Sequence, residues 1–323
     1  MSRIWRVFLA IAIVLVVIFA AAAVTISVLF GKTFEEIGIS NEPLLNGKSI
    51  ADMQLQHYKP KEIWPLASSL FRNNSSLVNY APSSDELTAT NKIFAQSSIK
   101  NKLNAVVQYS KLIYESATFY DQTIVASGLL VLTDKQLCAV LNSTVKQAPN
   151  DLLLKTSADI LDFLGSRQIK QILDLLEEFD VTVEQIRLFE KDEVPHLQIL
   201  MSLDISQQTK DLYVPFLGRP NPRVYVDVDY CLSVTETGFI SLSTPMLSVN
   251  GQDAALSRAV LDGLFIALAD EGADPMTTQS LADSVAAFVG VVFEHVGSVG
   301  NNTSLGMSGV DATAHTLCFV ANT

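Results

Sequence analysis

The chain has 323 residues, of which 49% are hydrophobic and 17% are charged, and its formal net charge is −12. This composition suits one large domain or two small ones with a sizeable core, and it excludes an intrinsically disordered chain. The acidic balance also excludes nucleic acid as an expected partner, because a negatively charged domain repels phosphate backbones.

The first predicted element is a membrane anchor. Residues 7–30 are apolar and contain no charged residue, and a run of about 20 such residues spans a bilayer. Arg3 and Arg6 precede this run, so the positive-inside rule places the N-terminus in the cytoplasm and the rest of the chain outside. A cleaved signal peptide is the alternative, because the alanines at 20–23 offer an A-x-A site. We expect residues 1–30 to be the cytoplasmic tip and transmembrane helix of a single-pass cell membrane protein.

The next segments connect the anchor to the domain. Residues 31–60 mix turn residues with apolar ones and are interpreted as a juxtamembrane neck, followed by an extracytoplasmic domain over 61–323. Apolar residues at helical spacing predict helices at 63–71 and at about 84–116, with a loop at 79–84 between them.

A strand-to-helix junction follows. Residues 123–132 read as a strand that leads into Thr133 and Gln136, a capping box that predicts a helix ending near Lys146. A second helix is expected at 166–178, with apolar residues on one face.

Two hairpins come next. Residues 181–189 are expected to pair with 196–206 through a turn at 190–195, and 224–234 with a partner strand that contains residues 240–242. Apolar and polar residues alternate in these strands, which predicts an antiparallel sheet with one apolar face.

Helices must cover that apolar face, and two candidates follow. Residues 253–270 and 277–296 both have helical apolar patterns, and Asp283 in the second favours a buried helix over a second membrane span. The Gly-, Ser- and Asn-rich residues 297–309 are expected to form a loop before a closing strand at 312–320. The fold class is therefore α+β.

Few residues suggest chemistry. The four histidines, His57, His196, His295 and His315, lie in separate segments without metal-ligand spacing, so we expect no metal and no cofactor. Cys138 could pair with a distant histidine as a nucleophile, but its place beside the apolar face of a helix favours burial. Asp227 and Asp229 share one face of a strand. They could act in acid–base chemistry, bind calcium, or simply form a solvated polar face.

A family resemblance joins these segments. The stretches LLVLTDKQLCAVLN, VTVEQIRLF, LQILMSLDIS, VYVDVDYCLSV and GFISLSTPMLSVNG, within about 123–270, resemble the TULIP superfamily of tubular lipid-binding domains. The likeness is to single-anchor extracytoplasmic members from Gram-positive bacteria. This resemblance implies a curved antiparallel sheet that holds a long helix, and an apolar groove for a lipid or other hydrophobic ligand.

The resemblance gives the candidate groove its residues, which come from the apolar positions of the strands. They are Leu197, Ile199, Met201, Leu203, Val226, Val228, Leu232, Ile240 and Leu242. The same residues could instead form a filled core. We therefore expect a non-enzymatic lipid-binding or lipid-shielding domain, with the bilayer as a partner through the anchor. The alternatives are a cell-envelope scaffold with a protein or wall-polymer partner, and an envelope hydrolase.

Overall fold

The computed structural model describes residues 31–45, 47–85, 87, 129–148, 170, 172–173, 176–177, 179–210, 213–214, 217–234, 240–268, 276–299 and 303–321. The predicted anchor at 7–30 lies outside these ranges, as do nearly all of the helix predicted at 84–116 and most of that at 166–178. Among the described helices, none has the length and apolarity that a membrane crossing requires.

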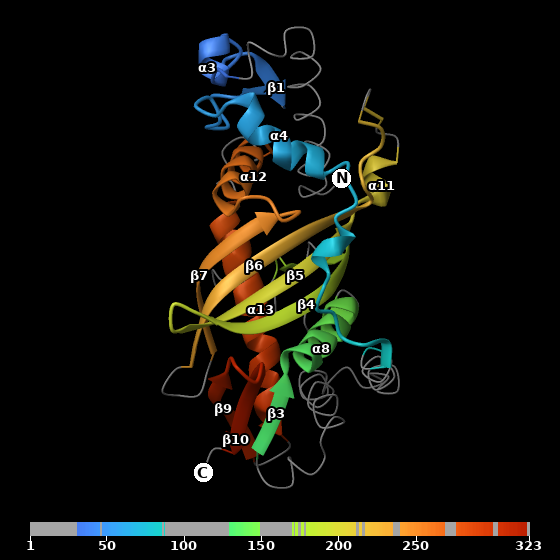
Figure 1. Cartoon of the computed structure of the whole chain (residues 1–323), viewed down its shortest axis with the longest axis vertical. Helices are drawn as coiled ribbons and strands as arrows, with labels where there is room; N and C mark the ends of the chain where they lie inside the picture. Colours follow the sequence, from blue (N-terminus) through green and yellow to red (C-terminus); the bar gives the residue numbers. More distant parts are fainter. Residues whose placement is uncertain are drawn as a thin grey trace.

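The centre of the molecule is a four-stranded antiparallel sheet. It contains β4 (Asp180–Lys191), β5 (Val194–Asp204), β6 (Arg223–Val234) and β7 (Ile240–Val249), in the order β4-β5-β6-β7 (Figure 1). The predicted β4–β5 and β6–β7 hairpins are therefore confirmed, as is the mixed helix-and-sheet class. β4 and β6 extend one or two residues beyond their predicted bounds. β5 begins two residues earlier than predicted, because its pairing with β4 continues toward the turn, and it also ends two residues earlier.

Three helices pack against this sheet. α8 (Asp134–Gln147) lies along β4, and both α12 (Ala254–Leu268) and α13 (Thr278–Gly297) pack on β7. Figure 1 shows α13 passing behind the sheet in that view. The α13 side chains Ala282, Val285, Phe288, Val289 and Val292 are all buried in the core. The predictions of a helix at 253–270 and of a buried helix at 277–296 are thus confirmed.

The start of α8 is fixed by its sequence. The Thr133 hydroxyl accepts a hydrogen bond from the Gln136 N–H at 3.2 Å, and the Gln136 side chain accepts one from the Thr133 N–H at 2.9 Å. This reciprocal pair satisfies two N–H groups that would otherwise lack partners at the helix start. The predicted capping box is confirmed.

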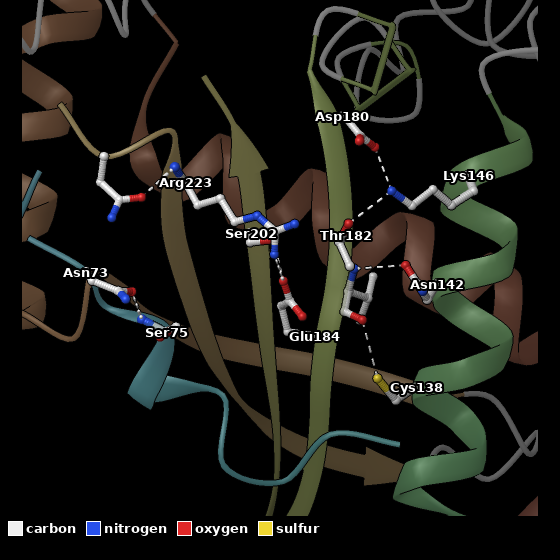
Figure 2. A network of polar contacts seen from close by, with 12 residues as sticks. Asn73, Ser75, Cys138, Asn142, Lys146, Asp180, Thr182, Glu184, Ser202 and Arg223 are labelled. Carbon is white, nitrogen blue, oxygen red and sulfur yellow. Dashed lines mark hydrogen bonds and ion pairs between the residues drawn. The ribbon is translucent and has the colours of Figure 1, made fainter. Parts of the chain in front are cut away.

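Side chains of α8 cover the free edge of β4 (Figure 2). The Asn142 side-chain carbonyl accepts a hydrogen bond from the Val183 N–H at 3.1 Å, and the Cys138 thiol donates one to the Val183 backbone carbonyl at 3.6 Å. Lys146 reaches Asp180 at 2.6 Å, at the start of the same strand. An open strand edge invites pairing with other chains, so α8 protects this one. Cys138 is fully buried, as its sequence position predicts.

A second antiparallel sheet lies below the central sheet, at the bottom of the view in Figure 1. Its order is β3-β10-β9-β8, with β3 (Leu129–Thr133), β10 (Thr316–Ala321), β9 (Thr303–Asp311) and β8 (Ser298–Val299). The predicted loop at 297–309 is therefore wrong, because β8 and most of β9 lie there. The glycines and serines of 297–309 have low strand propensity. Pairing of β9 with β10 nevertheless stabilises a strand there.

The segment before the sheet is also folded. It contains α3 (Phe34–Ile37), β1 (Pro43–Leu45), β2 (Lys48–Ser49), α4 (Pro60–Ser69) and the 3₁₀ turn η1 (Ser75–Leu77). The helix predicted at 63–71 is confirmed as α4, displaced by a few residues because Pro60 begins it. Phe34, Ile50, Met53 and Leu55 belong to the same hydrophobic core as the sheet.

After η1 the chain crosses the face of β4 opposite α13 (Figure 1). The Gln185 side-chain carbonyl accepts the backbone N–H groups of Asn79 and Tyr80 at 3.1 and 3.0 Å. The Tyr80 hydroxyl continues to Asp134 at the start of α8, at 3.1 Å. The outer face of the sheet is defined here as the face opposite α13. The crossing segment covers this face at β4, so β5, β6 and β7 form most of what remains.

One buried hydrogen bond joins the sheet to α13. Tyr230 of β6 is fully buried, and its hydroxyl donates to the Ala282 carbonyl at 2.7 Å. Tyr230→Phe is expected to lower the free energy of unfolding by about 1 kcal/mol, because it removes one buried hydrogen bond and leaves the packing intact. Denaturant unfolding of both proteins measures this. Tyr213→Phe, at a side chain that is 67% exposed, is the control and should unfold like the unmodified chain.

Candidate functional site

The nine candidate groove residues all lie on the inner face of the sheet, which is the face toward α13. The register pairs Ile199 with Val228 and Met201 with Val226, and antiparallel partners project to the same side. Farther along, Leu232 pairs with Leu242. The remaining members, Leu197, Leu203 and Ile240, have Tyr230, Val224 and Val234 as their partners. The alternation seen in the sequence thus identifies one continuous face.

Burial divides this face into two kinds of position. Five of the nine residues belong to the closed core, with exposures of 0 to 4%: Leu197, Ile199, Leu203, Val228 and Leu232. The other four, Met201, Val226, Ile240 and Leu242, are partly buried and pack against that core. The centre of the inner face is therefore filled by protein, and apolar surface reaches solvent at two separate places on it.

The first of these places is the Met201–Val226 pair. In the same cross-strand row, Val183 on β4 and Val249 on β7 are buried, so the partly exposed pair lies on the two inner strands, β5 and β6. The second place lies at the turn end of the β6–β7 hairpin and consists of Val234, Ile240 and Leu242. Partly exposed apolar side chains within a covered face are suited to contact with a hydrophobic ligand.

The outer face holds the two carboxylates noticed in the sequence. Asp227 accepts a hydrogen bond from the Gln198 amide at 2.6 Å through one oxygen, while its other oxygen is buried without a hydrogen-bond partner. The pKa of Asp227 is raised to about 6, chiefly by burial. The hydrogen bond from Gln198 and the charge of Arg187 lower this pKa, whereas the nearby Asp229 raises it. Asp227 is thus not part of a simple solvated surface, which was one of its three interpretations.

Asp229 has a different partner. Its carboxylate lies 2.8 Å from His196 Nδ1, and the two side chains are only 14% and 10% exposed. On its other side, His196 Nε2 lies 3.8 Å from the sulfur of Cys231. The Thr244 hydroxyl of β7 donates to the same sulfur at 2.8 Å. Two adjacent strands, β5 and β6, therefore bring a thiol, an imidazole and a carboxylate together, and β7 adds a hydroxyl.

Sequence reasoning missed this pairing of His196 with Cys231. From the sequence, Cys138 was the cysteine considered as the partner of a distant histidine, and the four histidines lay in separate segments. His196 and Cys231 are direct cross-strand partners between β5 and β6. The sequence did contain a signal for this pairing. Each of the two residues alternates with the apolar residues of its strand, so both belong to the outer face.

The described residues contain no group of three or more His, Cys, Asp or Glu side chains arranged to hold a metal ion. None of Cys138, Cys231 and Cys318, which all lie in the described part of the chain, forms a disulfide. A comparison with known protein families, curated proteins and solved structures finds no match to this chain.

Proposed function

We propose that this chain is a membrane-tethered protein that binds or shields a lipid or other amphiphile outside the cell membrane, without reacting with that ligand. The predicted anchor at 7–30 would hold the domain near the bilayer surface, in a single-pass arrangement with a cytoplasmic N-terminus. The TULIP-like resemblance supports the same function, with the sheet curving around α13.

The observation that carries this proposal is the partly exposed Met201–Val226 pair on the inner face. Most of that face is sealed, with Ile199 and Val228 fully buried one row away. An acyl chain that contacts Met201 and Val226 removes apolar surface from water, at roughly 25 cal/mol per Å². The flexible thioether of Met201 can adjust to chains of different shape.

Native mass spectrometry of residues 31–323, extracted from the host, tests the proposal directly. Co-purified lipid, or uptake of a fluorescent fatty acid by the stripped protein, is the expected result. A protein that carries no lipid and takes up no probe would contradict it. That result would favour the envelope scaffold instead, whose solid core binds no small ligand.

A substitution at the partly exposed Met201–Val226 pair makes the test specific. Met201→Gln is expected to weaken binding of the fluorescent fatty acid about tenfold, because a polar amide replaces an apolar contact worth about 1 to 2 kcal/mol. Met246→Gln is the matched control. Met246 pairs with Asp229, so it lies on the outer face, and it is 46% exposed. Fluorescence titration should show unchanged affinity in the control, and equal losses in both variants would remove Met201 from the site.

A further inference from the structure

The outer face holds a second cluster that lipid binding on the inner face does not use. It is defined here as the thiol cluster: Cys231, His196, Asp229 and Thr244. Cys231 pairs across the sheet with both His196 of β5 and Ser243 of β7, so neighbouring strands on both sides contribute to the cluster. Cys231 is a partly exposed residue, so the cluster lies at the surface of the sheet and not in its closed core.

The hydrogen bonds of the thiol cluster set the direction of proton transfer. When Asp229 accepts the Nδ1–H of His196 at 2.8 Å, Nε2 of the same ring carries no proton. Nε2 then faces the sulfur of Cys231 at 3.8 Å and can accept its proton. The ring is also held by Phe189, whose centroid lies 5.3 Å from that of His196.

The resulting thiolate has a donor of its own. The Thr244 hydroxyl donates to the sulfur at 2.8 Å, and a hydrogen bond to a charged acceptor is stronger than one to a neutral acceptor. The cluster thus contains a nucleophile, a base and a group that orients the base, which are the three parts of a nucleophilic triad.

The available cysteines favour acyl chemistry over disulfide exchange. The chain has three cysteines, and the other two lie elsewhere: Cys138 is fully buried in α8, and Cys318 is in β10 of the second sheet. Neither lies on β5, β6 or β7, the strands that form the thiol cluster. A thiol next to a base is suited to accept an acyl group.

We propose that Cys231 is a nucleophile on the outer face that accepts the acyl group of an activated carboxylic ester. The thiol proton passes to His196 Nε2, the sulfur bonds to the acyl carbon, and the carbon–oxygen bond to the leaving alcohol breaks. The alcohol takes the proton from His196, and a thioester remains on Cys231. Water then attacks the thioester while His196 takes a proton from it and returns one to the sulfur, which releases the carboxylic acid.

Each residue has a distinct role in this reaction. Cys231 forms the covalent bond and His196 moves the proton, so both are catalytic residues. Asp229 is a positioning residue that acts through His196.

The test uses the full chain in detergent micelles and p-nitrophenyl acetate. We expect one equivalent of p-nitrophenolate to be released in a rapid burst, with the acetyl group found by mass spectrometry on the peptide that contains Cys231. Cys231 should react about 100-fold faster than it does in the same chain unfolded in guanidinium, which is the usual size of a general-base contribution. Equal rates for Cys231 in the folded and unfolded chain would overturn the proposal without any variant.

Variants then separate the roles. His196→Gln should reduce the acetylation rate about 100-fold, whereas Cys318→Ser should leave the rate at Cys231 unchanged. Asp229→Asn should slow the acetylation, and Asp229→Glu should restore part of the rate because a carboxylate can again accept the Nδ1–H of His196. A purely structural role for Asp229 would give equal losses in the two variants. An unchanged rate in a folded His196→Gln protein would also overturn the proposal.

Discussion

Gly263→Ala is expected to lower the free energy of unfolding by about 2 kcal/mol, although alanine normally stabilises a helix relative to glycine by about 1 kcal/mol. Gly263 lies within α12, and a Cβ built there would stand 2.5 Å from the backbone carbonyl oxygen of Met53. Because that neighbour is backbone, it cannot rotate away, and either the helix or the 50–55 segment must shift. Denaturant unfolding measures the loss.

Gly290 provides a matched control in the other long helix. It lies within α13, and a Cβ added there meets nothing within 4 Å. Gly290→Ala should therefore raise the free energy of unfolding by up to about 1 kcal/mol, which is the ordinary propensity gain. If both substitutions stabilised the protein, the close approach of α12 to Met53 would be contradicted.

The contact at Gly263 has a second measurable consequence. Met53, Phe34 and Ile50 are all buried, and they attach the segment predicted as a juxtamembrane neck to the rest of the core. Displacement of α12 by an alanine side chain should loosen this segment first. Limited proteolysis of Gly263→Ala is therefore expected to cut within residues 31–60 sooner than in the unmodified chain.

Local patterns predicted the parts of the fold that local interactions determine. The capping box at Thr133 located the start of α8 because its hydrogen bonds join residues three apart. The alternation at 197–205 identified the inner face because side chains of a strand project to opposite sides in turn. β8 and β9 were missed because their residues have little strand preference and depend on pairing with β10.

In the candidate sites, too, local patterns could be predicted from the sequence and tertiary contacts could not. The nine inner-face residues could be selected from the sequence, since each strand reveals its own apolar phase. Their division into sealed and partly exposed positions could not be predicted, because it depends on how α8, α12 and α13 cover the sheet. The thiol cluster required the register between β5 and β6. Residues 205–222 connect these strands, and so long a connection does not fix a register as a tight turn does.

Asp227→Asn is expected to remove a pH dependence of stability between about pH 4 and pH 6. The pKa of Asp227 is raised to about 6, chiefly by burial, so over this range the folded chain binds a proton that the unfolded chain has released. The free energy of unfolding must then fall as the pH rises through the window, and a shift of one pKa unit corresponds to about 1.4 kcal/mol. Asparagine keeps an acceptor for the Gln198 amide and introduces no charge.

The measurement is the difference in unfolding free energy between Asp227→Asn and the unmodified chain, taken from pH 4 to pH 7. As the pH rises across this range, the unfolding free energy of the variant should increase by about 1 to 3 kcal/mol relative to that of the unmodified chain. The reason is that ionisation of the buried carboxylate lowers stability only in the unmodified chain. Asp192→Asn, in the exposed turn between β4 and β5, is the control and should give a constant difference. A constant difference for Asp227→Asn as well would mean that its carboxylate is ionised in the folded protein throughout. Asp227 would then belong to the solvated polar face that its alternation in β6 first suggested.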